Sequence, residues 1–351
     1  MTVTERSQRL GQALREAGHG WAGSVFQPLP DKGLAHDHLR IVGAGALARI
    51  PKQSQLGLPA QQNLDYQIAC FERAVVGGHA PRLLGWLPPS RWLPRGALLV
   101  EEIVGRAAQL PADLPAIVRA LAALHRLPLP AAAQRPPLLD AHDPLLALLD
   151  EVQQQALHLD AAALAPEVSR AIGHEIERLR AACALAGRPP RQLIAFDGHP
   201  GNFIVRDDGE AVLVDLEKCR YSHPGLDLAH ATLYTSTTWD IQSHAVLSLP
   251  EVVGAYRAWD QEMGAAAAPA RAWQLPLRRA MWLWSISWCA KWRVLSDAPR
   301  PAGADGEDWS SARSDAALVE HVRDRVDHYL SAPVVASVLA GFDALDRALA
   351  A

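Results

Sequence analysis

The stretch Leu193-Ile-Ala-Phe-Asp197-Gly-His-Pro-Gly-Asn202-Phe-Ile-Val205 decides how this sequence is interpreted. An apolar segment leads to Asp197, a Pro-Gly turn follows, and a second apolar segment begins directly after Asn202. A third apolar segment, Ala211-Val-Leu-Val214, leads to Asp215-Leu-Glu217. Apolar runs bounded by Asp, Asn, Gly and Pro are typical of strands joined by turns. The pattern therefore predicts a β-hairpin that brings Asp215 close to Asp197 and Asn202.

These three side chains suit the transfer of a phosphoryl group to a hydroxyl. That reaction needs a carboxylate that orients the attacking oxygen and accepts its proton, and oxygen ligands that hold Mg²⁺ on nucleotide phosphates. Asn202 follows Asp197 by five residues, and Asp215 follows Asn202 by 13 residues, which is a specific spacing. The alternative is that all three only form surface turns. We favour the catalytic interpretation because each Asp is flanked by an apolar strand that buries its surroundings.

Composition narrows the class of protein. The chain has 351 residues, and because a domain has about 150 residues on average, this length predicts two lobes. It contains 34 Lys and Arg residues against 38 Asp and Glu residues. The mildly acidic balance argues against nucleic-acid binding, which needs a basic surface. The four cysteines form no C-x-x-C motif, residues 1–18 resemble an amphipathic helix more than a signal peptide, and no apolar run is long enough to span a membrane. We expect a cytoplasmic protein without nucleic-acid or membrane partners.

The pattern of elements changes at about residue 104. Before it, the sequence predicts a small α+β lobe, with strands at 24–26, 38–42, 46–50 and 97–100 and a helix at 63–76. After it, the sequence predicts a mostly helical lobe around the hairpin, with helices at 114–127, 145–158 and 161–187 and over most of 225–351. We therefore expect one lobe at 1–103 and a second at 104–351.

The sequence resembles the aminoglycoside phosphotransferase/choline kinase family, whose members are small-molecule kinases with a protein-kinase-like fold. The likeness rests on the 193–205 stretch, on Val212-Leu-Val-Asp-Leu-Glu217 and on Gly225-Leu-Asp-Leu-Ala229, and it spans about residues 23–235. The resemblance implies a bilobal α+β fold. Its small β-rich N-terminal lobe would bind the nucleotide, and its larger, mostly helical C-terminal lobe would carry the catalytic and substrate-binding residues.

The resemblance also implies roles for the matching residues of the C-terminal lobe. Asp197 would be the catalytic base, and Asn202 and Asp215 would be ligands of Mg²⁺. Asp227 would brace the catalytic loop through backbone N–H groups, and Glu217 would support the same site. The family commonly has His-Gly-Asp where this chain has Ala195-Phe-Asp197, so His199 either takes over the bracing of the loop or faces the substrate.

In the N-terminal lobe, the resemblance implies a hinge at Glu101 to Ile103 whose backbone hydrogen-bonds a purine. The turn that contains Gly33 would cover the phosphates with backbone N–H groups. The cation for the phosphates is either Arg49 or Lys52, of which we favour Arg49. The helix carboxylate that would pair with this cation is replaced by Gln67, which can form a hydrogen bond but no ion pair.

We therefore expect a Mg²⁺-dependent kinase that transfers the γ-phosphoryl group of ATP or GTP to a hydroxyl of a small-molecule acceptor. The departures from the family pattern favour one alternative, a nucleotide-binding pseudokinase or regulatory protein without turnover. A kinase acting on proteins is a weaker alternative, because only 11 residues separate Asp215 from Asp227. Trp284, Trp288 and Trp292 recur along one helix face, and we expect them to be core residues more than an aromatic cage for a cationic acceptor.

Overall fold

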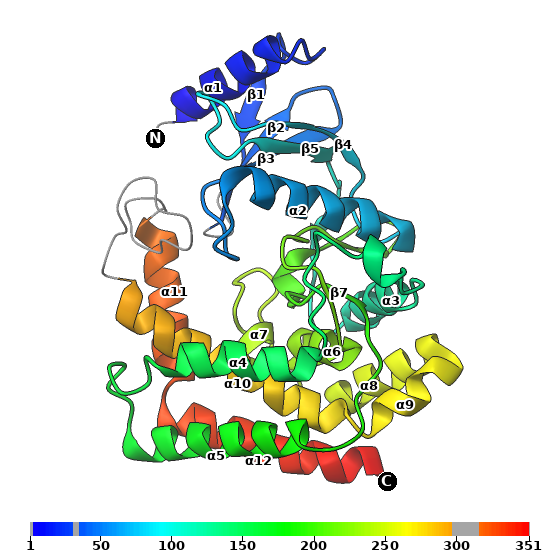
Figure 1. Ribbon diagram of the computed structural model, residues 1–351, viewed down its shortest axis with the longest axis vertical. Helices are drawn as coiled ribbons and strands as arrows, with labels where there is room; N and C mark the ends of the chain where they lie inside the picture. The colour runs from blue at the N-terminus through cyan, green and yellow to red at the C-terminus, as the bar shows by residue number, and fades with distance from the viewer. Residues whose placement is uncertain (1–2, 31–34, 297–315, 351) are drawn as a thin grey trace. The chain divides into compact units, whose positions relative to one another are not determined.

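The computed structural model describes residues 3–30, 35–296 and 316–350, which form two compact units (Figure 1). The N-terminal unit comprises Met1–Val75, Pro81–Ile103 and Ser296–Val322, as far as these are described. The C-terminal unit comprises Val76–Ala80, Val104–Leu295 and Arg323–Ala351, with the same restriction. Gly33, the residue expected in the phosphate-covering turn, lies outside the described residues.

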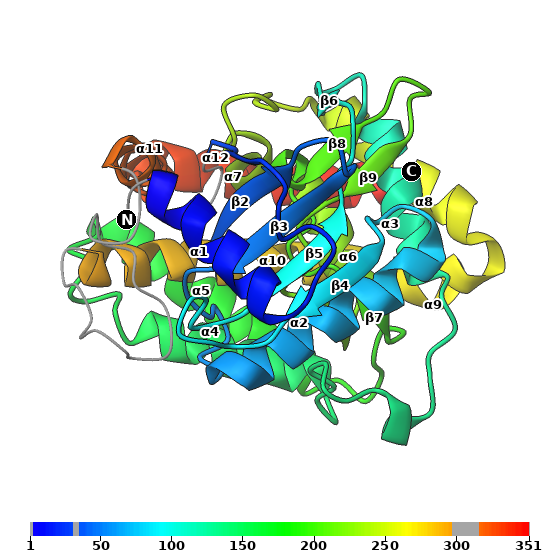
Figure 2. The ribbon, with the colours of Figure 1, turned by 90° about the horizontal axis from the view of Figure 1, so that it is seen from above.

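The N-terminal unit contains one antiparallel sheet in the strand order β1-β2-β3-β5-β4 (Figure 2). Its elements are α1 (Val3–Glu16), β1 (Phe26–Pro28), β2 (His36–Ile41), β3 (Ala46–Pro51), α2 (Ala60–Ala74), β4 (Leu83–Leu87) and β5 (Ala97–Glu101). The helices α1 and α2 lie on opposite faces of this sheet (Figure 1). Leu10 and Leu14 of α1 are fully buried in one core cluster with Leu39, Ala48 and Leu99 of the sheet. Successive residues of a strand point to opposite faces, so the neighbours of Ala48 point away from α1.

The C-terminal unit is mostly helical. Its first half contains β6 (Arg106–Ala107), α3 (Leu114–His125), α4 (Pro144–Ala156), α5 (Pro166–Cys183), β7 (Gln192–Ile194), β8 (Phe203–Val205) and β9 (Ala211–Leu213). Its second half contains β10 (Arg220–Ser222), α6 (Pro224–Thr232), α7 (Tyr234–Thr237), α8 (Leu249–Met263), α9 (Ala268–Arg271), α10 (Gln274–Leu295) and α12 (Ala332–Ala350). The helix α11 (Ala316–Tyr329) begins in the N-terminal unit and ends in this one. The longest helix, α10, is central and packs on α4, α5, α6 and α12.

Most of the elements predicted from the sequence are present. The predicted hairpin is confirmed as the antiparallel pair of β8 and β9, and the predicted helices are confirmed as α1, α2, α3, α4 and α5. The strand expected at 24–26 begins only at Phe26. The helix expected from 161 begins at Pro166, because proline is well suited to the first position of a helix. The strand β4 was not predicted: its sequence contains Gly85 and shows no regular alternation, and a register shift occurs at this glycine.

Within the residues that the structure describes, no single helix is long and apolar enough to cross a membrane, although α11 and α12, bent by 64°, meet that criterion as a pair. All four cysteines are free and buried.

The packing of α1 on the sheet predicts a large effect of Leu99→Ala on stability. Leu99 is fully buried at the centre of the core cluster, so the substitution removes buried apolar contacts and leaves a cavity. We expect the free energy of unfolding to fall by about 2–5 kcal/mol in urea denaturation. The matched control is Leu84→Ala in β4, where the side chain is 37% exposed and the expected change is below about 1 kcal/mol. Equal losses in the two variants would contradict this assignment of the core.

Candidate functional site

The loop at 195–202, called the Asp197 loop below, joins β7 to β8. It ends in a short 3₁₀ turn at Pro200–Asn202, whose first N–H groups are satisfied locally. The Nδ1 atom of His199 accepts a hydrogen bond from the N–H of Gly201, and the carbonyl of His199 accepts one from the N–H of Asn202. Of the two positions that the sequence allowed for His199, the structure therefore favours the bracing of the loop.

Hydrogen bonds connect Asp197 to Asn202, and Asn202 to the residue before Asp215. The Nδ2 atom of Asn202 donates to the backbone carbonyl of Asp197 at 2.8 Å. The carbonyl of Asn202 accepts from the N–H of Val214 at 2.9 Å, so Asp215 follows directly after a residue that is bonded to the loop. The amide oxygen of Asn202 stays available for a ligand, because its amide nitrogen makes the contact within the loop.

The buried carboxylate of Asp227 holds the start of the Asp197 loop. Asp227 lies on α6 and is fully buried. Its two oxygens accept hydrogen bonds from the backbone N–H groups of Ala195 and Phe196, each at 2.7 Å. Phe196 has a φ of +61°, a left-handed conformation that is unfavourable for a residue with a side chain. The two charge-assisted hydrogen bonds stabilise this conformation at the residue before Asp197.

A second pair of residues extends this contact into the helical core. The Nε1–H of Trp259 on α8 donates to Nδ1 of His125 at 3.0 Å. Because Nδ1 accepts, the imidazole proton lies on Nε2, which donates to the carboxylate of Asp227 at 3.0 Å. All three side chains are buried. Nothing in the local sequence indicates that His125 pairs with Trp259, which follows 134 residues later.

Asp197 is surrounded by positive or protonatable groups. Its Oδ2 atom lies 2.8 Å from Nζ of Lys218, and its Oδ1 atom lies 3.8 Å from Nδ1 of His230. Burial alone would raise the pKa of the Asp197 carboxyl, but the charge of Lys218, together with His199 and His230, holds it well below its usual range. Asp197 is therefore ionised at neutral pH. Sequence reasoning missed Lys218; its place three residues after Asp215 was the available signal.

His230 is neutral at physiological pH. It lies on α6, and its Nδ1 atom donates to the backbone carbonyl of Phe196 at 3.2 Å. Burial lowers the pKa of His230 to about 4, an effect that the nearby carboxylate of Asp197 only partly opposes. The loop is therefore bonded on one side to a carboxylate and on the other to an uncharged imidazole.

The donor set of the loop fits Mg²⁺. The described residues contain no group of three or more His, Cys, Asp or Glu that could hold a metal by itself. Mg²⁺ does not need such a cage, because it usually binds one or two carboxylates and completes its shell with phosphate oxygens and water. The carboxylate of Asp215 and the amide oxygen of Asn202 supply suitable hard ligands. Glu217, two residues after Asp215 in the chain, is buried.

The two candidate cations of the N-terminal unit point to different faces of its sheet. Arg49 lies opposite His38 in the β2–β3 register, is 4% exposed, and has its guanidinium 5.5 Å from the ring centre of Phe71 on α2. Lys52 lies just beyond β3, with Nζ 3.9 Å from Asp37, which in turn is bonded to Arg6 of α1. Arg49 therefore shares the face of α2, and Lys52 lies on the side of α1.

Gln67, the residue expected beside the phosphate-binding cation, contacts a histidine. Gln67 of α2 is buried and its Oε1 atom lies 3.2 Å from Nε2 of His36. The expected hinge residues lie at the end of β5: Glu101 is bonded to Arg82 through its side chain and its N–H, and Ile103 is buried. Within the described parts of the chain, the N–H and C=O groups of Ile103 have no hydrogen-bond partner.

The tryptophan stripe of α10 is only partly core. Trp292 is buried, whereas Trp284 and Trp288 are half-buried. The indole Nε1–H of Trp284 donates a hydrogen bond to Glu151 of α4 at 2.9 Å.

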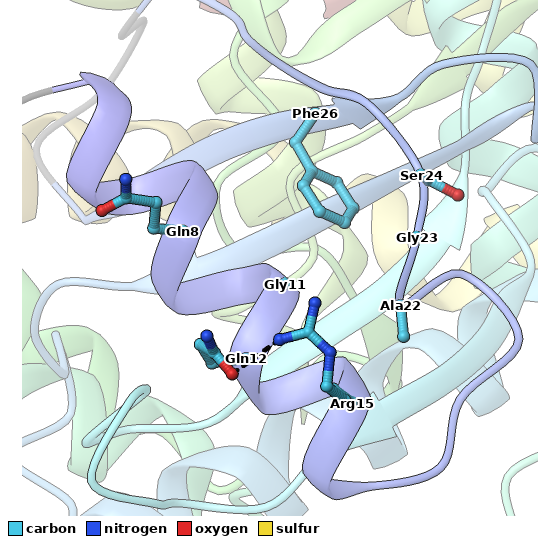
Figure 3. A pocket seen from close by; sticks show the side chains of 8 residues that line it. All are labelled: Gln8, Gly11, Gln12, Arg15, Ala22, Gly23, Ser24 and Phe26. Atoms are coloured by element: carbon cyan, nitrogen blue, oxygen red, sulfur yellow. Dashed lines mark hydrogen bonds between the residues drawn. The ribbon is translucent and has the colours of Figure 1, made fainter.

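A hollow of about 300 Å³ in the N-terminal unit lies between α1 and the segment before β1 (Figure 3). Its lining residues are Gln8, Gly11, Gln12, Arg15, Ala22, Gly23, Ser24 and Phe26. The guanidinium of Arg15 is bonded there to Gln12 at 2.7 Å, so the one cation of the lining is engaged within α1. None of the predicted site residues lines this hollow.

The bonds of Asp227 predict that Asp227→Asn loosens the Asp197 loop. An asparagine replaces one acceptor oxygen by an NH₂ group. Either the N–H of Phe196 then loses its acceptor, or the N–H of Ala195 and the Nε2–H of His125 lose theirs. We expect faster hydrogen exchange at Ala195 and Phe196 and a loss of about 1–3 kcal/mol in the free energy of unfolding. Asp208→Asn is the control, because Asp208 accepts a hydrogen bond at an exposed turn. Unchanged exchange at 195 and 196 would contradict the bracing role.

The depressed pKa of His230 predicts a pH dependence of stability. The folded state resists protonation of His230 down to about pH 4, whereas an unfolded histidine protonates near 6.5. The contribution is therefore complete above about pH 6.5 and is lost as the pH falls toward 4, by about 3 kcal/mol at most. His230→Gln should reduce the stability difference between pH 7.5 and 5.0 in urea denaturation. The exposed control His174→Gln should leave that difference unchanged, and an equal effect of both variants would contradict the assignment.

Comparison with known proteins places this geometry in a family. Residues 73–273 match the model of the phosphotransferase enzyme family. No curated protein sequence matches the chain. A choline/ethanolamine kinase family protein from Mesorhizobium loti is similar in structure, with a TM-score of 0.58 and 17% identity over 95% of this chain and 97% of that chain.

Two further solved structures have a TM-score of 0.58 to this chain. An ethanolamine kinase from Plasmodium vivax is 12% identical over 93% of this chain and 87% of that chain. A GDP complex of aminoglycoside 2'-phosphotransferase-IIIa is 14% identical over 92% of this chain and 98% of that chain. These likenesses confirm the predicted α+β fold, with its small sheet-containing part and its larger helical part. Because the matched residues make up more than half of the chain, this protein belongs to the phosphotransferase enzyme family.

Proposed function

We propose that this protein is a small-molecule kinase that transfers the γ-phosphoryl group of ATP or GTP to a hydroxyl, with Mg²⁺ bound at the phosphates. The observation that carries the proposal is the pair of hydrogen bonds that joins Asn202 to Asp197 and to Val214, the residue before Asp215. Solved structures with the same fold include proteins named as choline, ethanolamine and aminoglycoside kinases, which supports a small hydroxyl-bearing acceptor.

In the proposed reaction, each residue of the loop has a distinct part. The Oδ1 atom of Asp197 orients the acceptor hydroxyl and takes its proton late, while the acceptor oxygen forms its bond to the γ-phosphorus. The bond between that phosphorus and the bridging oxygen breaks, and its electron pair leaves with the nucleoside diphosphate. Asn202 and Asp215 would hold Mg²⁺, which would neutralise charge on the phosphates when bound. Asp227, His199 and Glu217 keep this arrangement in place.

We assign nucleotide binding to residues 1–103, and catalysis and acceptor binding to residues 104–351. Arg49 is the proposed phosphate-binding cation, because Lys52 is already paired with Asp37 on the side of α1. The backbone of Ile103, whose N–H and C=O have no partner in the described residues, suits the edge of a purine, and Glu101 holds the strand before it. The GDP complex of a protein with the same fold supports a purine nucleotide as donor.

A nucleotide-binding pseudokinase or regulatory protein is the second candidate. It is favoured by Gln67, which bonds to His36 in place of an ion pair with the phosphate-binding cation. The presence of Asp197, Asn202 and Asp215 favours the enzyme, because loss of an oriented base alone lowers the rate by about 10²–10⁴-fold and a protein without turnover has no need to keep these groups.

Calorimetric titration of ATP and GTP, with and without Mg²⁺, tests the donor site. We expect Mg²⁺ to strengthen nucleotide binding to the wild type and to have little effect on Asp215→Ala. Asp197→Asn should bind nucleotide normally and lower turnover by about 10²–10⁴-fold in a coupled assay of nucleoside diphosphate release with a panel of small alcohols, amino alcohols and sugars. Asp208→Ala is the control for both measurements, because Asp208 lies on the exposed hairpin turn.

Each outcome of these titrations separates the candidates. Turnover of any acceptor by the wild type eliminates the pseudokinase. Binding of Mg²⁺-nucleotide without turnover of any acceptor favours the pseudokinase over the enzyme. Full turnover by Asp197→Asn removes Asp197 from the mechanism, and Mg²⁺-dependent binding by Asp215→Ala removes Asp215 from the metal site.

A further inference from the structure

Lysine is scarce in this chain, and one of its lysines lies at the Asp197 loop. Only Lys32, Lys52, Lys218 and Lys291 stand among the 34 basic residues, so arginine supplies most of the positive charge. Lys218 lies in the turn between β9 and β10, and its side chain is 15% exposed. An ammonium is a compact charge with three N–H donors, which can contact oxygen atoms on several sides at once.

The ammonium of Lys218 has three N–H donors and uses one of them in the described structure. Its Nζ atom is 2.8 Å from Oδ2 of Asp197, which is its only hydrogen-bond partner among the residues that the structure describes. Two of its three N–H groups are therefore available to a ligand at the same place. Burial alone would lower the pKa of Lys218, but the carboxylates of Asp197 and Glu217 raise it, so the group stays charged.

The indole of Trp284 packs against Lys218, and further contacts connect this indole to α4, β10 and the Asp197 loop. The Nζ atom of Lys218 lies 5.8 Å from the ring centre of Trp284 on α10, and the ring of Phe196 packs edge-on against the same indole at 5.0 Å. Glu151 of α4 accepts hydrogen bonds from Trp284 and from Arg220 of β10. The guanidinium of Arg220 lies 3.6 Å from the ring centre of Phe196, so Arg220 contacts both Glu151 and Phe196.

We propose that Lys218 binds the transferred phosphoryl group in addition to holding Asp197, an inference that rests on the proposed function. Lys218 occupies Oδ2 of Asp197, and Oδ1 lies beyond hydrogen-bond distance of His230 and is left for the acceptor hydroxyl. An acceptor oxygen about 3 Å from Oδ1, and about 3–3.5 Å from the γ-phosphorus, brings the equatorial phosphoryl oxygens within reach of the ammonium.

The chemistry of the transfer gives this cation a defined role. In a loose transition state, negative charge spreads over the three equatorial oxygens of the phosphoryl group. A cation that is already held in place stabilises this charge without reorganisation. Lys218 keeps its proton throughout, since the hydroxyl proton passes to Oδ1 of Asp197. Lys218 would therefore contact a nucleoside triphosphate but not a nucleoside diphosphate.

Binding of two nucleotides tests the inference without an acceptor. The probes are Mg²⁺-ADP and the Mg²⁺ complex of the β,γ-imido analogue of ATP, or the guanine equivalents if only these bind. For Lys218→Met we expect at least about tenfold weaker binding of the imido triphosphate, with affinity for the diphosphate within about twofold of the wild type. Lys218→Arg retains a cation and should restore most of the difference. Lys291→Met, the other described lysine of the C-terminal unit, is the matched control.

Lys218→Gln keeps an N–H donor for Asp197 and removes the charge, so it tests the inference if Lys218→Met does not fold. Selective loss of triphosphate affinity in either variant supports a phosphoryl contact. Equal affinities of wild type and variants for the triphosphate, or an equal loss for both nucleotides, would show that Lys218 only holds Asp197 and would overturn the inference alone. A wild type that binds neither nucleotide overturns the proposed function and this inference together.

Discussion

The candidate site depends on the hydrogen bonds that the carboxylate of Asp227 accepts from the Asp197 loop. This carboxylate is fully buried, and a buried charge is stable only when hydrogen-bond donors surround it. Two backbone N–H groups of the Asp197 loop and the imidazole of His125 supply these donors. The same bonds hold Phe196 in a conformation that costs about 1–3 kcal/mol by itself. One side chain on α6 thereby positions Asp197, and the bond from Trp259 to His125 connects this arrangement to the core of the C-terminal unit.

The charges around the Asp197 loop are arranged so that the carboxylate of Asp197 stays ionised. Lys218 supplies the compensating charge, whereas burial keeps His230 neutral, so only one full positive charge is bonded to Asp197. The indole of Trp284 packs against Lys218 and against the ring of Phe196. In the proposed reaction, this loop would orient the acceptor hydroxyl before the transfer begins, and such positioning is a main contribution that a protein makes to phosphoryl transfer.

Elementary strand geometry explains how the N-terminal unit separates its two cations. Alternation along β3 puts Ala48 in the core under α1 and Arg49 on the face of α2. Lys52 follows the end of the strand and pairs with Asp37 on the side of α1. The sequence favoured Arg49 over Lys52 without excluding either, because the two residues are close neighbours in the chain. The two residues differ in the helix on their side of the sheet, which is α2 for Arg49 and α1 for Lys52.

The sequence alone determined the elements whose pattern is local: the hairpin of β8 and β9, the amphipathic helices, and the spacing of Asp197, Asn202 and Asp215. These follow from periodicity and turn residues, which act over a few positions in the chain. Strand β4, with its glycine and bulge, lacked such a pattern and was missed. Only the tertiary structure decided that Lys218 pairs with Asp197, that Trp259 bonds to His125, and that Trp284 packs beside the loop instead of in the core. Those contacts join residues that are 21 to 134 positions apart, and a contact at such separations depends on how helices and strands pack, which no local pattern encodes.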